Sequence, residues 1–221
     1  MSNVSRALLV RSLVFCLFAT LAAPAVRAQA TSGNPALDKH LARLDLAISG
    51  VGSFTKDVSG TNYLGVKVTQ NAASTLGALV TVRYTKSPWI GGEFNYGYAR
   101  YTQNFSNYLV GGAQTNANEY SLGYVAHPPH LILGAQPFIA GGAGSTAFRP
   151  TPGGGQGLPV QARMTYYYAA GVEKIVLSEH FGLRAQVRQT FFKAPDFGQN
   201  YLTIQQRTST FEPGVGFFIK F

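Results

Sequence analysis

The stretch FEPGVGFFIKF, residues 211–221, alternates between large and small or charged residues up to its last position. Counting back from Phe221, every second residue is apolar, whereas the positions between them include Lys220, Glu212 and two glycines. A period of two is typical of a β-strand whose two faces lie in different environments. Terminal residues of soluble domains usually fray into solvent, so the fold depends on what this apolar stripe faces.

The first thirty residues, MSNVSRALLVRSLVFCLFATLAAPAVRAQA, have the features of a secretory signal peptide. Arg6 and Arg11 are followed by an eleven-residue apolar core, LVFCLFATLAA, and residues 28–30 fit the small-x-small cleavage pattern. The apolar run is too short for a spanning helix, and Pro24 argues against an uncleaved anchor helix. We therefore predict export and cleavage near Ala30.

Cleavage would remove the only cysteine, Cys16, so the mature chain is predicted to hold no disulfide. Cys16 follows Phe15 inside the apolar core, which does not fit a lipidation site. Of the 18 Lys and Arg, the signal peptide contains Arg6, Arg11 and Arg27; the remaining 15 exceed the 9 Asp and Glu by six. The basic residues are not clustered, so this charge favours anionic lipid or lipopolysaccharide as a partner and not nucleic acid.

Seven further segments alternate like the last one, so we predict eight strands. The predicted strands are residues 43–50, 75–85, 89–101, 118–127, 136–148, 163–175, 182–192 and 211–221. In the first of them Leu44, Leu46 and Ile48 lie opposite Asp45, Ala47 and Ser49, whereas the facing of the glycine-rich segment 136–148 is ambiguous. After the signal peptide no run of 18 apolar residues follows, so a transmembrane helix is not expected.

The connections between these strands differ in length in a regular way. Three long polar connections cover 51–74, 102–117 and 149–162, and a fourth begins with KAPDFGQNY. The segments KSPW, HPPHLILG and LSEHF form short turns. Long loops at one end and short turns at the other are typical of outer-membrane barrels.

Strands of about ten residues are long enough to cross a bilayer at a tilt, and lipid tolerates no unpaired strand edge. The predicted fold is all-β, a closed antiparallel eight-stranded transmembrane barrel with up-and-down topology. The predicted organisation is a signal peptide over 1–30, a periplasmic N-terminal lead over 31–42 and an outer-membrane barrel over 43–221. The alternative is a soluble lipocalin-like barrel with the apolar face inside, which would leave Glu93 and Arg188 outside and leave Phe221 unexplained.

Aromatic residues near the strand ends are predicted to form two girdles at the membrane surfaces. Tyr84, Trp89, Tyr124, Phe138 and Phe221 are assigned to the short-turn end. Tyr98, Tyr101, Phe148, Phe191 and Phe211 are assigned to the long-loop end.

This pattern resembles the OmpA/OmpX-like small outer-membrane barrels. The resemblance rests on the signal peptide, the alternating strands, VRYTKSPWIGGEFNYGYARY, QPFIAGGAGSTAF, FGLRAQVRQTFF and Phe221, and it covers residues 43–221. It implies that the barrel-assembly machinery reads Phe217, Ile219 and Phe221. The chain stops at the barrel, so the peptidoglycan-binding domain of two-domain members is not expected.

An eight-stranded barrel is just wide enough for side chains to fill its interior. By strand parity the charged residues on the inner face are Asp45, Arg83, Glu93, Glu119, Glu173, Arg184, Arg188, Glu212 and Lys220. Buried charges require partners, so we expect the pairs Asp45–Lys220, Glu173–Arg184, Arg188–Glu212 and Arg83–Glu93. The predicted interior is an ionic plug, with a gated ion path as the alternative.

No catalytic site, cofactor or metal site is predicted. The four histidines, His40, His127, His130 and His180, fall in the N-terminal lead or the short turns, whereas lipid chemistry on the outer leaflet would need them at the long-loop end. HPPH alone is a weak metal motif. Tyr63, Tyr108 and Tyr201 in the long loops are candidates for contact with a surface ligand. The predicted function is a structural and surface-interaction barrel of the outer membrane, with a narrow pore as the alternative.

Overall fold

Side-chain burial alternates along the long strands, and in the middle of the barrel the polar half of each strand is the buried half. In β9 (Phe181–Lys193) Arg184 and Arg188 are each 2% exposed, whereas the residues directly before them, Leu183 and Val187, are 52% and 46% exposed. A soluble sheet buries its apolar side chains and exposes its charges. The reverse arrangement is stable only where the outer surface faces lipid.

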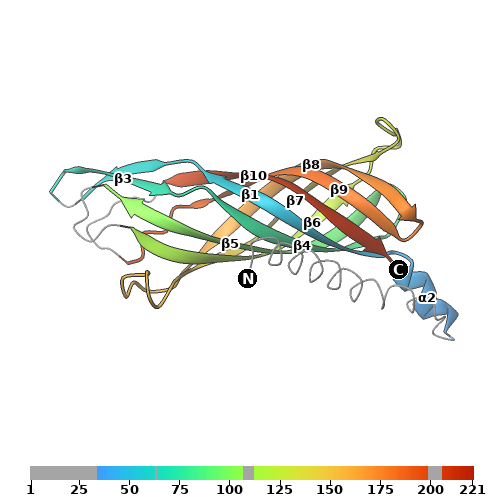
Figure 1. Cartoon of the computed structure of the whole chain (residues 1–221), viewed down its shortest axis with the longest axis horizontal. Helices are drawn as coiled ribbons and strands as arrows, with labels where there is room; N and C mark the ends of the chain where they lie inside the picture. Colours follow the sequence, from blue (N-terminus) through green and yellow to red (C-terminus); the bar gives the residue numbers. More distant parts are fainter. Residues whose placement is uncertain (1–33, 63, 107–111, 199–205) are drawn as a thin grey trace, which may run out of the picture. The chain divides into compact units, whose positions relative to one another are not determined.

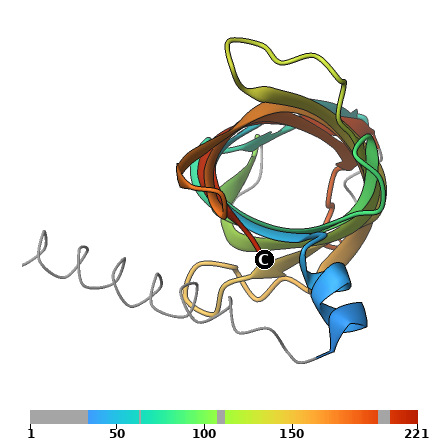
Figure 2. The same cartoon turned by 90° about the vertical axis from the view of Figure 1, so that its right-hand side faces the viewer.

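Eight long strands close into a ring (Figures 1 and 2). The computed structural model describes residues 34–62, 64–106, 112–198 and 206–221. The strands of the ring are β1 (Leu44–Thr55), β4 (Thr75–Thr85), β5 (Ile90–Phe105), β6 (Ala113–Ala126), β7 (Gln136–Pro150), β8 (Gln161–Ser178), β9 and β10 (Arg207–Lys220). Each is hydrogen-bonded to the next along the chain, and β1 pairs antiparallel with β10 from Asp45↔Lys220 to Thr55↔Thr210. The predicted barrel fold is therefore confirmed.

The long connection predicted over 51–74 is wrong as a structureless loop. It contains the hairpin of β2 (Val58–Thr61) and β3 (Lys67–Ala72), and β3 continues the wall by pairing with the far end of β5, Gln70↔Phe105. These short strands lack a sustained apolar stripe. Backbone pairing along the extended end of β5 holds them, which alternation in the sequence does not reveal.

The interior of the barrel changes from polar to apolar toward its long-loop end, where an apolar cluster fills the lumen. Its buried members are Val58, Val68, Ala72, Tyr101, Phe105, Ala117, Phe148, Phe192, Ala194 and Phe197. The segment after β9 supplies Ala194 and Phe197, and the Gln70 amide holds it by donating to the Pro195 carbonyl at 2.9 Å. Phe197 is 1% exposed and adopts a φ of 51°, a left-handed conformation that bulky residues rarely take.

The turn between β6 and β7 shows how a short connection is made. Ile132 and Ala135 exchange two backbone hydrogen bonds of 2.9 Å around Leu133 and Gly134, whose φ angles are 51° and 73°. Positive φ at both central positions is the geometry of a type I′ turn, and glycine adopts it without steric cost. Within the connection from β6 to β7, the chain therefore reverses its direction over two residues.

The chain divides into two units, residues 1–44 with Phe221 and Asp45–Lys220. The described part of the first contains α2 (Pro35–Leu41), which Asn34 caps by accepting the Ala36 amide at 3.1 Å. Within the described ranges no helix is long and apolar enough to span a membrane. The predicted signal peptide over 1–30 lies outside the described residues.

Candidate functional site

The lumen on the short-turn side contains a cluster of five buried charged residues from β1, β4, β5, β8 and β9, here called the short-turn cluster. Arg83 donates to Glu93 from Nη2 at 2.9 Å and to Glu173 from Nη1 at 2.5 Å. Arg184 lies with Nε 3.0 Å from the same Glu173 oxygen and donates from Nη2 to Asp45 at 3.1 Å. All five residues are at most 7% exposed, so each charge depends on the others for compensation.

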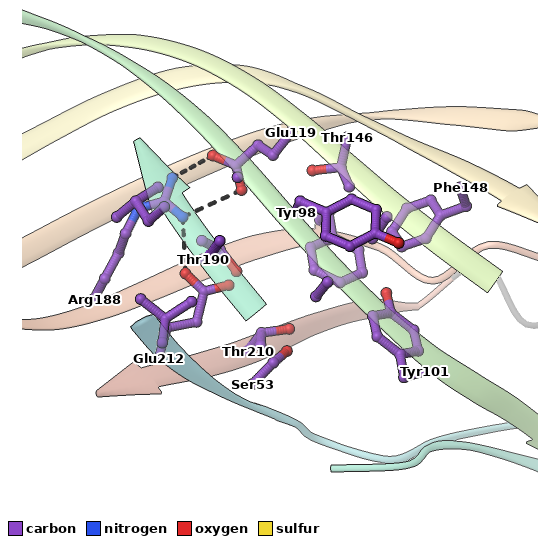
Figure 3. A pocket seen from close by; sticks show the side chains of 17 residues that line it. Ser53, Tyr98, Tyr101, Glu119, Thr146, Phe148, Arg188, Thr190, Thr210 and Glu212 are labelled. Carbon is purple, nitrogen blue, oxygen red and sulfur yellow. Dashed lines mark hydrogen bonds and ion pairs between the residues drawn. The ribbon is translucent and has the colours of Figure 1, made fainter. Parts of the chain in front are cut away.

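A second group, here called the central cluster, lies farther toward the long-loop end. Arg188 donates from Nη1 to Glu212 at 2.8 Å and to Glu119 at 3.2 Å, and from Nη2 to the other Glu119 oxygen. Figure 3 shows the guanidinium pointing at both carboxylates, which come from β6 and β10. One arginine therefore connects strands on opposite sides of the lumen.

Tyr167 joins the two clusters. Its hydroxyl donates to Glu93 at 2.9 Å and accepts from the Asn95 amide at 3.0 Å, and its ring lies 4.5 Å from the Arg188 guanidinium carbon. Thr81 extends the chain of hydrogen bonds by donating to Asn95 at 2.7 Å. The polar interior is thus one connected network.

Aromatic rings pack between the buried guanidinium groups. Phe138 lies 4.7 Å from the guanidinium carbon of Arg83 and 5.6 Å from that of Arg184, and Phe218 lies 5.6 Å from that of Arg184. Gly171 makes room for Phe138, since a Cβ at this position would lie 2.7 Å from two ring carbons.

The network contains more acid than base. The carboxylates of Asp45, Glu93, Glu119, Glu173 and Glu212 face the guanidinium groups of Arg83, Arg184 and Arg188. Five negative groups against three positive ones give the lumen an acidic character, opposite in sign to the net charge of +9 of the whole chain.

Two cavities border this network. One of about 40 Å³ lies between the central cluster and the aromatic residues Tyr101, Phe148 and Phe192, and it has room for only a few water molecules (Figure 3). The other, of about 450 Å³, is a vestibule at the short-turn end whose walls include Asp45, Glu173, His127 and Lys220. The vestibule therefore lies at the short-turn end of the lumen, and Asp45 and Glu173 of the short-turn cluster form its inner wall.

His127, which follows β6, lies in the wall of the vestibule with Nε2 4.0 Å from a Glu173 oxygen. Its Nδ1 is buried without a hydrogen-bond partner in the described structure. Burial lowers the pKa of His127, and the positive charge of Arg83 acts in the same direction.

Two solved structures share this arrangement of strands. The outer membrane protein OprG from Pseudomonas aeruginosa matches with a TM-score of 0.58 and 16% identity over 80% of this chain and 95% of that chain. Neisserial surface protein A, NspA, matches with a TM-score of 0.54 and 14% identity over 80% of this chain and 97% of that chain. No protein-family model matches the sequence, and the comparison with curated proteins finds no relative.

The chain has the fold of the small OmpA/OmpX-like outer-membrane barrels. The resemblance seen in the sequence is thereby confirmed at the level of fold. The soluble lipocalin-like alternative does not fit, because Leu122 and Val215 in the middle of the outer wall are 67% and 70% exposed.

The charged residues assigned to the interior by parity occupy different depths. Seven of them are buried: Asp45, Arg83, Glu93, Glu119, Glu173, Arg184 and Arg188. Glu212 and Lys220 are half-buried. The structure brings together Arg83 with Glu93, Glu173 with Arg184, and Arg188 with Glu212.

The expected ion pair between Asp45 and Lys220 is wrong. The two residues are cross-strand partners, but Asp45 accepts from Arg184, whereas the Lys220 ammonium lies 5.6 Å from the Phe218 ring centre. In the described part of the chain Lys220 has no carboxylate within 4.0 Å. The arginine reaches Asp45 from β9, which is two strands away from β1 in the ring.

The residues assigned to the aromatic girdles lie on both sides of the barrel wall. Trp89, Tyr124 and Phe211 are exposed on the outside, and Tyr84, Tyr98 and Phe191 are half-buried on the same side of their strands. Phe138 is wrong: it is 2% exposed and lies inside beneath Arg83. Tyr101 and Phe148 are also interior, in the apolar cluster at the long-loop end. The strand of Phe138 and Phe148 carries small residues on both faces, so side-chain size did not reveal its inner side. Tyr101 lies an even number of residues from Glu93 on β5, so the alternation of that strand already placed it on the inner face.

Of the neutral members of the network, Thr81, Asn95 and Ser121 lie on the polar stripes that were predicted to face inward, whereas Tyr167 was not singled out. Parity was the available signal, because Tyr167 lies an even number of residues from Glu173 on the same strand. His127, His130 and His180 lie beyond the strand ends at the short turns, and His40 is in α2. Among the described residues no group of three His, Cys, Asp or Glu is arranged to hold a metal ion.

Proposed function

We propose that this protein is an integral outer-membrane barrel whose lumen is closed to solutes and whose long-loop end interacts with molecules at the cell surface. The filled lumen is the observation that carries the proposal. The short-turn cluster, the central cluster and the apolar cluster follow one another along the barrel, and the cavity between the last two holds about 40 Å³.

The outer wall supports a position in the membrane. On β10 the outward residues from Phe211 to Ile219 cover about 26 Å of strand, or about 20 Å perpendicular to the bilayer at the usual tilt. This height is close to that of the apolar band on known outer-membrane barrels, which is about 25 Å. We propose that the short turns face the periplasm and the long loops the exterior, with cleavage of the signal peptide near Ala30.

Biogenesis is proposed to involve the barrel-assembly machinery, which would read Phe217, Ile219 and Phe221. Phe217 and Ile219 lie on the outward face of β10, and the Phe217 ring stacks on Phe181 at 5.9 Å. These positions are accessible from the membrane side, as recognition during insertion requires. No cofactor and no catalytic role are proposed.

A narrow pore is the alternative function. The vestibule of about 450 Å³ and the acidic excess of the lumen favour it, since an acidic lumen attracts cations. A path through the barrel would require both ionic clusters and the apolar cluster to move.

Conductance in planar bilayers distinguishes the two functions. We expect no discrete current steps from the refolded wild-type chain. Replacing Arg188 and Glu212 with alanine should lower stability and leave the current unchanged, because the apolar cluster still closes the lumen. The matched control is Gly50→Ala on the outer wall, where a Cβ meets no atom within 4 Å. Cation-selective steps from the wild type, enlarged in the double variant, would establish the pore and refute the closed barrel.

A further inference from the structure

Three basic side chains lie together on the outer wall at the long-loop end. Arg207 at the start of β10 is the direct cross-strand partner of Lys193 at the end of β9. Lys56 follows β1, and its amide donates to the Ser209 carbonyl at 2.9 Å, which places it one diagonal step from Arg207. All three are exposed, on strands that neighbour one another in the ring. We call them the basic triad.

The arrangement is electrostatically unfavourable by itself. Directly opposite side chains on antiparallel strands have Cβ atoms about 5 Å apart, and like charges at this spacing destabilise the pair. Diagonal neighbours lie about 7–8 Å apart, so Lys56 adds to the same positive field. Such a cluster is stabilised when an anion binds to it.

The chain supplies no carboxylate to this cluster. All nine Asp and Glu belong to the described residues, and none of the ion pairs within 4.0 Å among those residues contains a triad cation. Five face the lumen, Asp196 binds Arg163 at 3.1 Å, and Asp57 accepts the Asn71 amide at 2.5 Å. Glu179 is in a short turn and Asp38 is in α2. An anion that pairs with the basic triad therefore comes from outside the chain.

The height of the triad on the wall indicates the source of that anion. Phe54 and Phe211 are outward cross-strand partners, 48% and 44% exposed, at the edge of the apolar band. Lys56 comes two residues after Phe54, and Arg207 four residues before Phe211. At the usual rise and tilt, these cations lie about 5–10 Å beyond the aromatic edge, which is the depth of lipid head groups.

We propose that Lys56, Lys193 and Arg207 bind the phosphate groups of lipopolysaccharide, whose acyl chains pack against Phe54 and Phe211. The proposal rests on the proposed membrane orientation, in which the long-loop end meets the outer leaflet. Several phosphates on one glycolipid match three clustered cations better than the single phosphate of a phospholipid. Arg207 adds two parallel donors suited to a phosphate.

Binding of purified lipopolysaccharide to the refolded full chain in neutral phosphatidylcholine vesicles tests the site. Lys56→Gln, Lys193→Gln and Arg207→Gln combined should weaken binding about 100-fold, or about fivefold for each basic charge at a membrane surface. The matched control is Lys86→Gln with Lys174→Gln, which removes two exposed charges on the short-turn side and should leave binding unchanged. Wild-type binding to dephosphorylated lipopolysaccharide should fall to the level of the triple variant.

Two results would overturn the site. One is a folded triple variant that binds within twofold of the wild type. The other is wild-type chain that binds dephosphorylated lipopolysaccharide, or phosphatidylglycerol vesicles, as well as it binds lipopolysaccharide. Should the triple variant not fold, the wild-type comparison of phosphorylated and dephosphorylated lipid decides alone. Failure of the lipopolysaccharide site is separated from failure of the proposed function by comparing heated and unheated wild-type chain on a gel. A wild-type chain whose band does not shift on heating is not a membrane barrel.

Discussion

Arg188 is the residue whose loss should reveal most about what holds the barrel together. It is 2% exposed and is the cation that neutralises both Glu119 and Glu212 in the central cluster. Arg188→Met preserves most of the side-chain length and leaves two carboxylates without a partner. Breaking a buried ion pair by removing one member costs about 3–5 kcal/mol, so we expect the free energy of unfolding to fall by that amount.

The compensating variant separates charge from packing. Arg188→Met combined with Glu119→Gln and Glu212→Gln removes all three charges and retains similar shapes. Replacing a whole buried ionic group with neutral residues is often close to neutral, so we expect the triple variant to be within about 1 kcal/mol of the wild type. The single variant and the triple variant should therefore differ by several kcal/mol.

Urea unfolding of the barrel in lipid vesicles measures these differences. Trp89 is the only tryptophan, is 51% exposed on the outside and reports the transfer of the wall from lipid to water. With a slope of about 2 kcal/mol per molar urea, the single variant should unfold about 2 M earlier than the wild type. Equal midpoints for wild type and Arg188→Met, or a triple variant as unstable as the single one, would refute the ionic account of the interior.

Two further predictions concern the packing of Phe138 and the titration of His127. Gly171→Ala should lower the free energy of unfolding by about 1–3 kcal/mol, because its Cβ would collide with the Ala185 carbonyl oxygen and lie 2.7 Å from Phe138 ring carbons. Gly141→Ala is the control, since the nearest atom is 3.5 Å away; equal urea midpoints for the two variants would contradict the packing argument. Burial holds the pKa of folded His127 below its ordinary value of 6.5, so the stability associated with neutral His127 is fully present above pH 6.5 and is lost as the pH falls toward the folded pKa. His127→Gln should therefore lose less stability than the wild type between pH 7.5 and pH 5.5, and parallel losses would exclude this role.

Two parts of the barrel wall were not predicted correctly from the sequence, the inner side of segment 136–148 and the hairpin β2–β3. The segment 136–148 has glycine, alanine or serine on both faces, so neither the side of Phe138 nor that of Phe148 was readable from size. Hairpin β2–β3 was hidden because its pairing partner is the end of β5, far along the chain. The alternation of side chains along the strands nevertheless predicted the inner face for five charged residues that the structure buries, Arg83, Glu93, Glu173, Arg184 and Arg188.

The sequence by itself determined that this chain is a closed barrel with an apolar outer wall, since a period of two assigns each side chain to one of two faces. Only the tertiary structure decided which charges meet across the lumen. Arg83 reaches Glu173 from β4 to β8, and Arg188 reaches Glu119 from β9 to β6, because strand tilt and barrel width set these contacts. Alternation along one strand carries no information about the opposite wall, so these partners follow from closure of the ring.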